Sequence, residues 1–227
     1  MSPVARTISE QLFESFCTEN GFQACPVRTE SHRTPDYILH IGGISIVVEV
    51  KQFDPNATEL ATLRKLPEEW GESDTFSPEI PGERVRSKID SALPQLKKVA
   101  GTSIPAMLVL YDNVRLWPEI CDANSIGVAL YGIESALISS KQAPEGGATI
   151  VARWHGGSRR ATPSANTTLS AIGILDRRHE STEITLSLFH NYFARNPIAI
   201  DALRCAQIKH YKLRGSPEQF YSTWTAT

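Results

Sequence analysis

Apolar residues recur at helical spacing near the start of the chain, which predicts an amphipathic helix over residues 8–20. Thr7 followed three residues later by Glu10 fits a capping box at the start of this helix. Gly21 fits the left-handed residue that often follows a helix. The apolar stripe consists of Ile8, Leu12, Phe13, Phe16 and Cys17.

Helical spacing returns in later segments. Residues 84–100 place apolar side chains one turn apart and predict a second long helix, which Pro94 should kink or split because proline donates no backbone hydrogen bond. Residues 197–213 show the same spacing and predict a helix near the end of the chain. A short helix is also expected near residues 57–66.

The clearest alternation of apolar and polar residues predicts a β-hairpin. Residues 37–41 and 44–50 are β-rich and are separated by Gly42-Gly43, a two-residue turn signature. The period of two along the second strand places Glu49 and Lys51 side by side on one face. Further strands are expected over residues 22–28, 105–111, 126–132, 148–154, 169–176 and 183–189.

This order of elements is typical of an α/β fold with a mixed central sheet. A helix is followed by a strand and a hairpin, then by a second helix, a strand and further strands. We expect residues 1–135 to form the core. Residues 136–227 are expected to form a mostly β extension with a C-terminal helix, packed on the same sheet as one domain.

Composition excludes few functions. The chain has 227 residues, of which 41% are hydrophobic and 21% charged, as in ordinary globular proteins. No apolar run approaches the roughly 18–20 residues that span a bilayer, and the first residues contain no apolar leader. The four cysteines lie far apart, so we expect reduced thiols and no zinc site. A cytoplasmic protein without a membrane partner is expected.

The net charge of −2 hides an uneven distribution. Residues 54–83 hold eight acidic residues against Arg64 and Lys65, together with four prolines, and are interpreted as a long insertion. This segment could close over a site as a lid or dock a protein partner. Basic residues are in excess over residues 84–98 and after residue 149, so the overall charge does not exclude a nucleic-acid partner.

Two carboxylates and a lysine at the predicted hairpin carry the candidate chemistry. Asp36 begins the first hairpin strand and Glu49 lies near the end of the second, so the two can converge across the ladder. Mg²⁺ binds through one or two carboxylates with waters and phosphate, and the backbone carbonyl of Val50 offers a third protein oxygen. Lys51 projects to the same face, where an ammonium can help activate water and stabilise phosphorane charge.

Pro35-Asp36 followed by Glu49-Val50-Lys51 resembles the motif of the PD-(D/E)XK, or restriction-endonuclease-like, nuclease superfamily. The order of helix, three-strand unit, helix and strand in that family is similar to the elements predicted over residues 8–111. The resemblance implies a restriction-endonuclease-like core in α-β-β-β-α-β order. It also implies hydrolysis of nucleic acid with Mg²⁺ or Mn²⁺ as cofactor, and DNA is expected as the substrate rather than RNA. The residues after about 112 fall outside it.

The resemblance also implies roles for further residues. A glutamate on the first helix often lies close to the metal in this family, which points to Glu10, with Glu14 as the substitute; either would act directly or through water. Capping of its own helix is an equally good role for Glu10. The resemblance further implies that polar side chains of the second helix contact substrate phosphates; these are Arg84, Arg86, Lys88 and Gln95. Gln52, beside the lysine, would assist them.

Two other functions remain open from the sequence. The same fold could serve as a non-catalytic module that binds nucleic acid or protein through the basic C-terminal strands. Alternatively, the acidic segment 54–83 could make the chain a protein-interaction module. The oligomeric state is not encoded by any motif, although homodimers are common where two DNA strands are cut.

Overall fold

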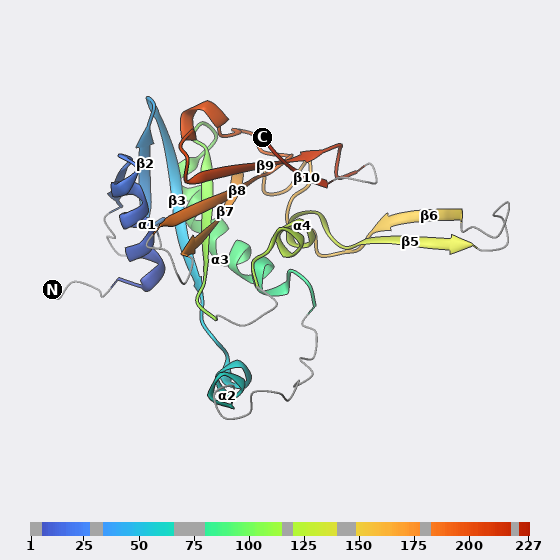
Figure 1. Ribbon diagram of the computed structural model, residues 1–227. Coiled ribbons are helices and arrows are strands. Elements are labelled where there is room, and N and C mark those ends of the chain that lie inside the picture. The colour runs from blue at the N-terminus through green and yellow to red at the C-terminus, as the bar shows by residue number, and fades with distance from the viewer. Residues whose placement is uncertain are drawn as a thin grey trace.

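We describe the protein from a computed structural model, which places residues 6–27, 34–65, 80–114, 120–139, 149–177, 183–218 and 223–227. Its centre is an eight-stranded sheet in the order β1-β2-β3-β4-β7-β8-β9-β10 (Figure 1). The strands are β1 (Gln23–Pro26), β2 (Tyr37–Ile41), β3 (Ile44–Phe53), β4 (Ala106–Asp112), β7 (Leu169–Arg177), β8 (Ile184–His190), β9 (Ile208–Arg214) and β10 (Thr223–Ala226). The helices are α1 (Ile8–Glu19), α2 (Ala57–Lys65), α3 (Glu83–Ala100) and α4 (Ala123–Tyr131), with a 3₁₀ turn at Ile200–Leu203.

The sheet is mixed. β3, β4 and β7 run parallel in its middle, β1 and β2 pair antiparallel on one side, and β8 pairs antiparallel with β7. β9 then pairs parallel with β8, and β10 closes the other edge antiparallel to β9. β5 (Glu134–Ser139) and β6 (Thr149–His155) pair antiparallel with each other and form a separate sheet. The expected α/β class with a mixed central sheet is confirmed, and strands from the last third of the chain continue the same sheet.

The predicted hairpin is confirmed as β2 and β3. Gly42 and Gly43 connect the two strands with φ of 53° and 81°. Two successive positive φ values define the turn that matches the twist of a hairpin, and glycine adopts them without a steric cost. The turn therefore fixes the register of β3 against β2, and with it the position of Glu49.

Alternate side chains along β3 pack into two different hydrophobic cores. Ile46, Val48 and Val50 are buried against α1, whereas Val47 belongs to the core beneath α3. The two helices thus cover opposite faces of the sheet (Figure 1). Glu49 and Lys51 share the parity of Val47, so they lie on the α3 face.

The start of α1 confirms the predicted capping box. The Thr7 hydroxyl accepts a hydrogen bond from the Glu10 backbone N–H at 3.3 Å, and the Glu10 carboxylate accepts one from the Thr7 N–H at 2.6 Å. Asn20 ends the helix, and Gly21 follows with φ of 70°. This end matches the left-handed residue predicted from the sequence.

α3 runs as one helix through Pro94, so the split that the proline could have caused is absent. Proline removes one backbone donor, but the apolar side of α3 is buried along its whole length. Val85, Ile89, Leu93 and Leu96 all belong to the core on this face. Burial of this stripe outweighs the lost hydrogen bond.

Two secondary-structure predictions are wrong. Residues 126–132 fall in α4, which Asp122 caps by accepting a hydrogen bond from Ser125 N–H at 2.6 Å and which ends before Gly132. Short apolar runs do not distinguish a buried strand from a buried helix, so the cap decided the outcome. The helix expected over residues 197–213 is instead a 3₁₀ turn followed by β9, which gains partners on both sides in β8 and β10.

The other predicted helix and strands are present. The short helix near 57–66 and the strands near 22–28, 105–111, 148–154, 169–176 and 183–189 are confirmed. Most of the acidic segment, residues 66–79, lies outside the described residues. None of the four cysteines, all of which lie in the described residues, forms a disulfide. None of the helices in the described ranges combines the length and the apolar character required to cross a membrane.

The junction between α3 and α4 leads to a stability prediction. Gly82 has φ of +72°, and a Cβ there would lie 2.7 Å from the Ser125 carbonyl oxygen and 2.9 Å from the Ala129 nitrogen. Both obstacles are backbone atoms, so Gly82→Ala should lower the free energy of unfolding by about 3 kcal/mol in urea titrations. Gly21→Ala is the control, since Gly21 also has positive φ but nothing within 4 Å, and should cost about 1 kcal/mol. Equal losses would contradict the steric account.

Candidate metal-binding site

Asp36 and Glu49 come together at the end of the β2–β3 ladder. Tyr37 pairs with Val48, so the next position places Asp36 opposite Glu49. The Val50 backbone N–H donates a hydrogen bond to Asp36 Oδ2 at 2.8 Å, which anchors this carboxylate. Because the N–H and C=O of one strand residue point to the same neighbouring strand, the Val50 carbonyl also faces the side of Asp36.

The Glu49 carboxylate is fully buried, with an exposed fraction of 0%. Oε1 accepts a hydrogen bond from the Lys51 ammonium, whose side chain is 25% exposed. Oε2 is buried and makes no hydrogen bond within the described parts of the chain. A buried polar oxygen without a partner costs about 1–3 kcal/mol, so this atom favours an additional ligand at the site.

The pKa values of both carboxylic acids are raised, and burial is the largest cause for each. Burial raises the pKa of Glu49 to about 7, the neighbouring Asp36 raises it further, and Lys51 opposes the shift. Burial also raises the pKa of Asp36, against the lowering by the Val50 N–H and by Lys51. The single ammonium of Lys51 does not balance the negative charge that Asp36 and Glu49 carry when both are ionised. A divalent cation would supply the missing positive charge.

The donor set fits one hard cation. Within the described ranges no group of three or more His, Cys, Asp and Glu side chains gathers in metal-ligating geometry. Asp36, Glu49 and the Val50 carbonyl are the oxygens that the protein would offer, and the other positions would be left to water and substrate oxygens. That balance is usual for Mg²⁺, which keeps several waters and takes one or two carboxylates.

The helix glutamates lie outside this pair. Glu10 is occupied by its capping box with Thr7, although its charge is close enough to raise the pKa of Asp36. Glu14 accepts a hydrogen bond from the Tyr37 hydroxyl at 2.9 Å and pairs with Arg6 at 2.6 Å. Of the two glutamates, Glu10 is the one whose negative charge influences Asp36.

Lys88 of α3 joins the site on the other side. Its ammonium lies 5.4 Å from the centre of the Phe53 ring. Burial lowers the pKa of Lys88, and the nearby charge of Lys51 lowers it further. Lys88 therefore lies within electrostatic range of Lys51 and of Asp54, the residue that follows β3.

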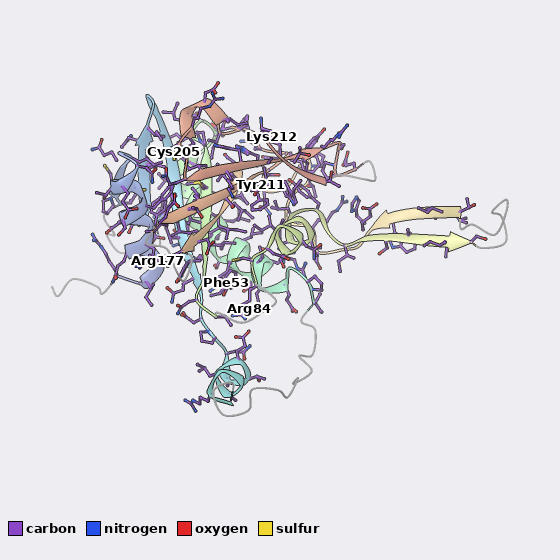
Figure 2. The ribbon with its side chains drawn as sticks, in the orientation of Figure 1. Phe53, Arg84, Arg177, Cys205, Tyr211 and Lys212 are labelled. Carbon is purple, nitrogen blue, oxygen red and sulfur yellow. The ribbon has the colours of Figure 1, made fainter. Side chains whose placement is uncertain are left out.

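The remaining basic and amide candidates on and around α3 are paired with other residues or buried. Arg84 pairs with Glu59 at 2.7 Å and lies over the Phe53 ring at 5.5 Å, next to which it is seen in Figure 2. Arg86 is 9% exposed and so is buried in its helix. Gln95 Nε2 donates to the Thr34 carbonyl at 3.2 Å.

Gln52, the amide next to the lysine, links two elements. Its Oε1 accepts a hydrogen bond from the Ser9 N–H at 3.1 Å, near the start of α1. Its Nε2 donates to the Asp54 carboxylate. This residue therefore ties β3 to the N-terminus of α1 and to the segment that leads into α2.

Sequence reasoning missed a polar group at the carboxyl ends of β3 and β4. Asn113 Nδ2 donates to Asp54 Oδ1 at 3.1 Å, and Asp112 accepts from the Val114 and Ile120 N–H groups, each at 2.9 Å. Phe53 pairs with Asp112 in the parallel ladder, so these residues follow directly on the strand that carries Lys51. Their position after buried parallel strands is a signal that could have identified them.

Comparison with known proteins adds no relative: no family model, curated protein or solved structure matches this chain.

Proposed function

We propose that this protein is a divalent-metal-dependent phosphodiesterase that hydrolyses nucleic acid, with DNA as the expected substrate. The observation that carries the proposal is the buried, unpartnered Oε2 of Glu49, opposite Asp36 and next to Lys51. The order of α1, β1 to β3, α3 and β4, with α2 inserted, supports the resemblance to the PD-(D/E)XK core. The proposed site is built entirely within this stretch.

Each residue would have a distinct task. Asp36 and Glu49, with the Val50 carbonyl, would hold Mg²⁺ or Mn²⁺, and the ion supplies Lewis-acid stabilisation of charge on phosphate oxygens. Lys51 would leave Glu49 and orient the attacking water or steady the developing negative charge. Lys88 would contact a neighbouring phosphate, because its ammonium lies within electrostatic range of that of Lys51.

One observation favours a non-catalytic alternative. Lys51 already forms an ion pair with Glu49, so the chain could bind nucleic acid or a protein partner without a metal. Such a module would bind DNA in a salt-dependent way, unaffected by divalent ions and by Lys51→Ala. The two functions are separated by incubating the purified chain with double-stranded DNA, single-stranded DNA and RNA, in Mg²⁺, Mn²⁺ or EDTA. Binding without cleavage under every metal would refute catalysis.

Metal binding also predicts a thermal shift that needs no substrate. Mn²⁺ at 100 times its Kd should stabilise the folded chain by about 3 kcal/mol, or several degrees in Tm. The shift should vanish in Asp36→Asn, because an amide removes one of the two anionic ligands. Asp201→Asn is the matched control, since that carboxylate is 86% exposed and pairs only locally with Arg204. An unchanged shift in Asp36→Asn would exclude this site.

A further inference from the structure

A threonine hydroxyl close to Asp36 is buried without a hydrogen bond. Thr34 stands two residues before Asp36 and is half-buried as a whole, but its Oγ1 is buried. This oxygen makes no hydrogen bond within the described parts of the chain. Folded proteins seldom leave such a group unpaired, because a hydroxyl that leaves water loses hydrogen bonds that the protein normally replaces. The Thr34 hydroxyl therefore favours a hydrogen-bond partner from outside the chain.

A second oxygen of this kind belongs to the candidate metal site. Among the residues that the structure describes, Glu49 Oε2 is the only other buried side-chain oxygen that makes no hydrogen bond. Asp36 lies opposite Glu49 across the β2–β3 ladder and follows Thr34 by two positions. Two residues of extended chain span at most about 7 Å. Thr34 and Glu49 therefore flank the same carboxylate.

The backbone holds Thr34 beside the helix that covers the site. Gln95 Nε2 of α3 donates a hydrogen bond to the Thr34 carbonyl at 3.2 Å. α3 covers the sheet face on which Glu49 and Lys51 lie. Pro35 has a fixed φ and restricts the residue before it to extended backbone, so Thr34 has little freedom to turn away. A hydroxyl held in this way is already positioned when a ligand arrives.

The chemistry of the two oxygens selects the ligand. Glu49 Oε2 belongs to a carboxylate and suits a divalent cation, whereas the Thr34 hydroxyl is neutral and both donates and accepts hydrogen bonds. Mg²⁺ and similar ions keep several waters when they bind to proteins. Hydrogen bonds from protein groups to such ligands orient them and strengthen metal binding. A hydrated divalent cation thus satisfies both oxygens, each in the way that its chemistry favours.

We propose that Thr34 is a further positioning residue of the candidate site, whose hydroxyl hydrogen-bonds a water in the ligand shell of the divalent cation. This inference rests on the proposed function, because it needs the cation. Asp36 and Glu49 would contact the ion itself, and Thr34 would act through the water. Partners of this outer kind typically contribute about 10–100-fold to metal affinity.

The test is Mn²⁺ binding by the chain without nucleic acid. Thr34→Val keeps the branched shape of the side chain and removes the hydroxyl. Isothermal titration calorimetry should show a Kd for Mn²⁺ about tenfold higher than that of wild type. The Tm of the metal-free variant should not fall, because Oγ1 makes no hydrogen bond to the described chain that could be lost. Thr34→Ser keeps the hydroxyl and should bind Mn²⁺ within about twofold of wild type.

Thr162→Val is the matched control, because its hydroxyl has a structural partner. Thr162 Oγ1 accepts a hydrogen bond from the Ala165 N–H at 2.9 Å. This variant should lower the Tm of the metal-free chain by about 2–4 °C and leave the Kd for Mn²⁺ unchanged. The two valine variants are therefore expected to respond in opposite ways, which separates binding of a ligand from support of the fold.

Three outcomes would overturn the inference. An equal Kd for Mn²⁺ in wild type and Thr34→Val would refute the role of Thr34 and leave the proposed function standing. A fall in the Tm of metal-free Thr34→Val, as large as that of Thr162→Val, would assign the hydroxyl to the fold. A wild-type chain that binds no Mn²⁺ would refute the metal site, and with it both the proposed function and this inference.

Discussion

Glu49→Gln or Asp36→Asn should lower metal-dependent cleavage of DNA by at least about 10³-fold, which corresponds to about 4 kcal/mol of transition-state stabilisation. Each change keeps the shape of the side chain and removes a negative charge that the proposed metal needs. The fold should survive, because Glu49 is buried with a pKa of about 7 and its neutral form is already accessible in the free protein. Initial rates on plasmid DNA, at several Mn²⁺ concentrations, are the measurement.

Lys51→Met should cause a loss of similar size without abolishing the Mn²⁺-induced rise in Tm. Lys51 contacts Glu49 and would act on water or phosphate, so its removal affects the reaction while leaving both carboxylates for the metal. This contrast between activity and metal binding distinguishes Lys51 from Asp36 and Glu49. Equal loss of the thermal shift in all three variants would assign Lys51 a structural role.

Matched controls are available on the surface. Glu19→Gln changes an exposed glutamate at the end of α1, and Lys98→Met changes an exposed lysine in the last turn of α3. Both should cleave DNA at the wild-type rate, because both side chains are exposed and neither makes a hydrogen bond or ion pair with Asp36, Glu49 or Lys51. Wild-type activity in Glu49→Gln would refute the proposed function, whereas a uniform decline that includes the controls would indicate a contaminating nuclease.

The folded protein should lose about 3 kcal/mol of stability from His190 as the pH falls from about 7 to about 4. His190 of β8 and His210 of β9 are buried side by side, with Nε2 of the first 2.9 Å from Nδ1 of the second. Burial, then the charges of His210 and Lys212, lower the pKa of His190 to about 4 from its ordinary 6.5. The pKa of His210 is lowered too, by burial first and also by Lys212 and Arg204, against a contact with the Leu203 carbonyl.

The sign follows from proton binding. Between pH 4 and 6.5 the unfolded chain binds a proton at position 190 that the folded protein does not, so acid favours unfolding. The contribution of His190 is complete above pH 6.5 and is lost as the pH falls towards the folded pKa of about 4. Glu49 acts in the opposite sense, because its raised pKa adds stability at low pH that is lost as the pH rises through about 7.

Comparison with His190→Leu isolates the histidine, since Glu49 is common to both proteins. The free energy of unfolding in urea should depend less steeply on pH in His190→Leu, and its difference from wild type should shrink by about 3 kcal/mol between pH 7 and 4. His40→Gln, an exposed histidine on β2, should keep the wild-type slope. Parallel curves for wild type and His190→Leu would contradict the shifted pKa.

Local signals in the sequence predicted the part of the fold that holds the candidate site. Gly42-Gly43 specified the turn, and the alternation from Ile44 to Lys51 specified which residues face α1 and which face α3. These features act between near neighbours, so they survive in any context that buries the hairpin. The convergence of Asp36 with Glu49 follows directly from that register.

Other features depended on residues far away in the chain. The sequence was compatible with two roles for Glu10, helix capping and metal binding. In the structure Glu10 caps α1, which packs on the sheet face opposite Glu49, and only this packing distinguishes the two roles. Arg84 and Arg86 looked equivalent to Lys88, but an ion pair with Glu59 and burial set them apart. Helix spacing alone cannot determine which partner a long side chain will meet.

The sequence by itself determined the capped first helix, the hairpin and the shared face of Glu49 and Lys51, because caps, turns and strand alternation are short-range. Only the tertiary structure decided that residues 126–132 are helical, that β9 replaces a helix, and that β5 and β6 leave the main sheet. It also decided that Glu49 is buried with one oxygen unpaired. Strand pairing and burial depend on distant segments meeting in space, and apolar spacing along the chain does not encode those partners.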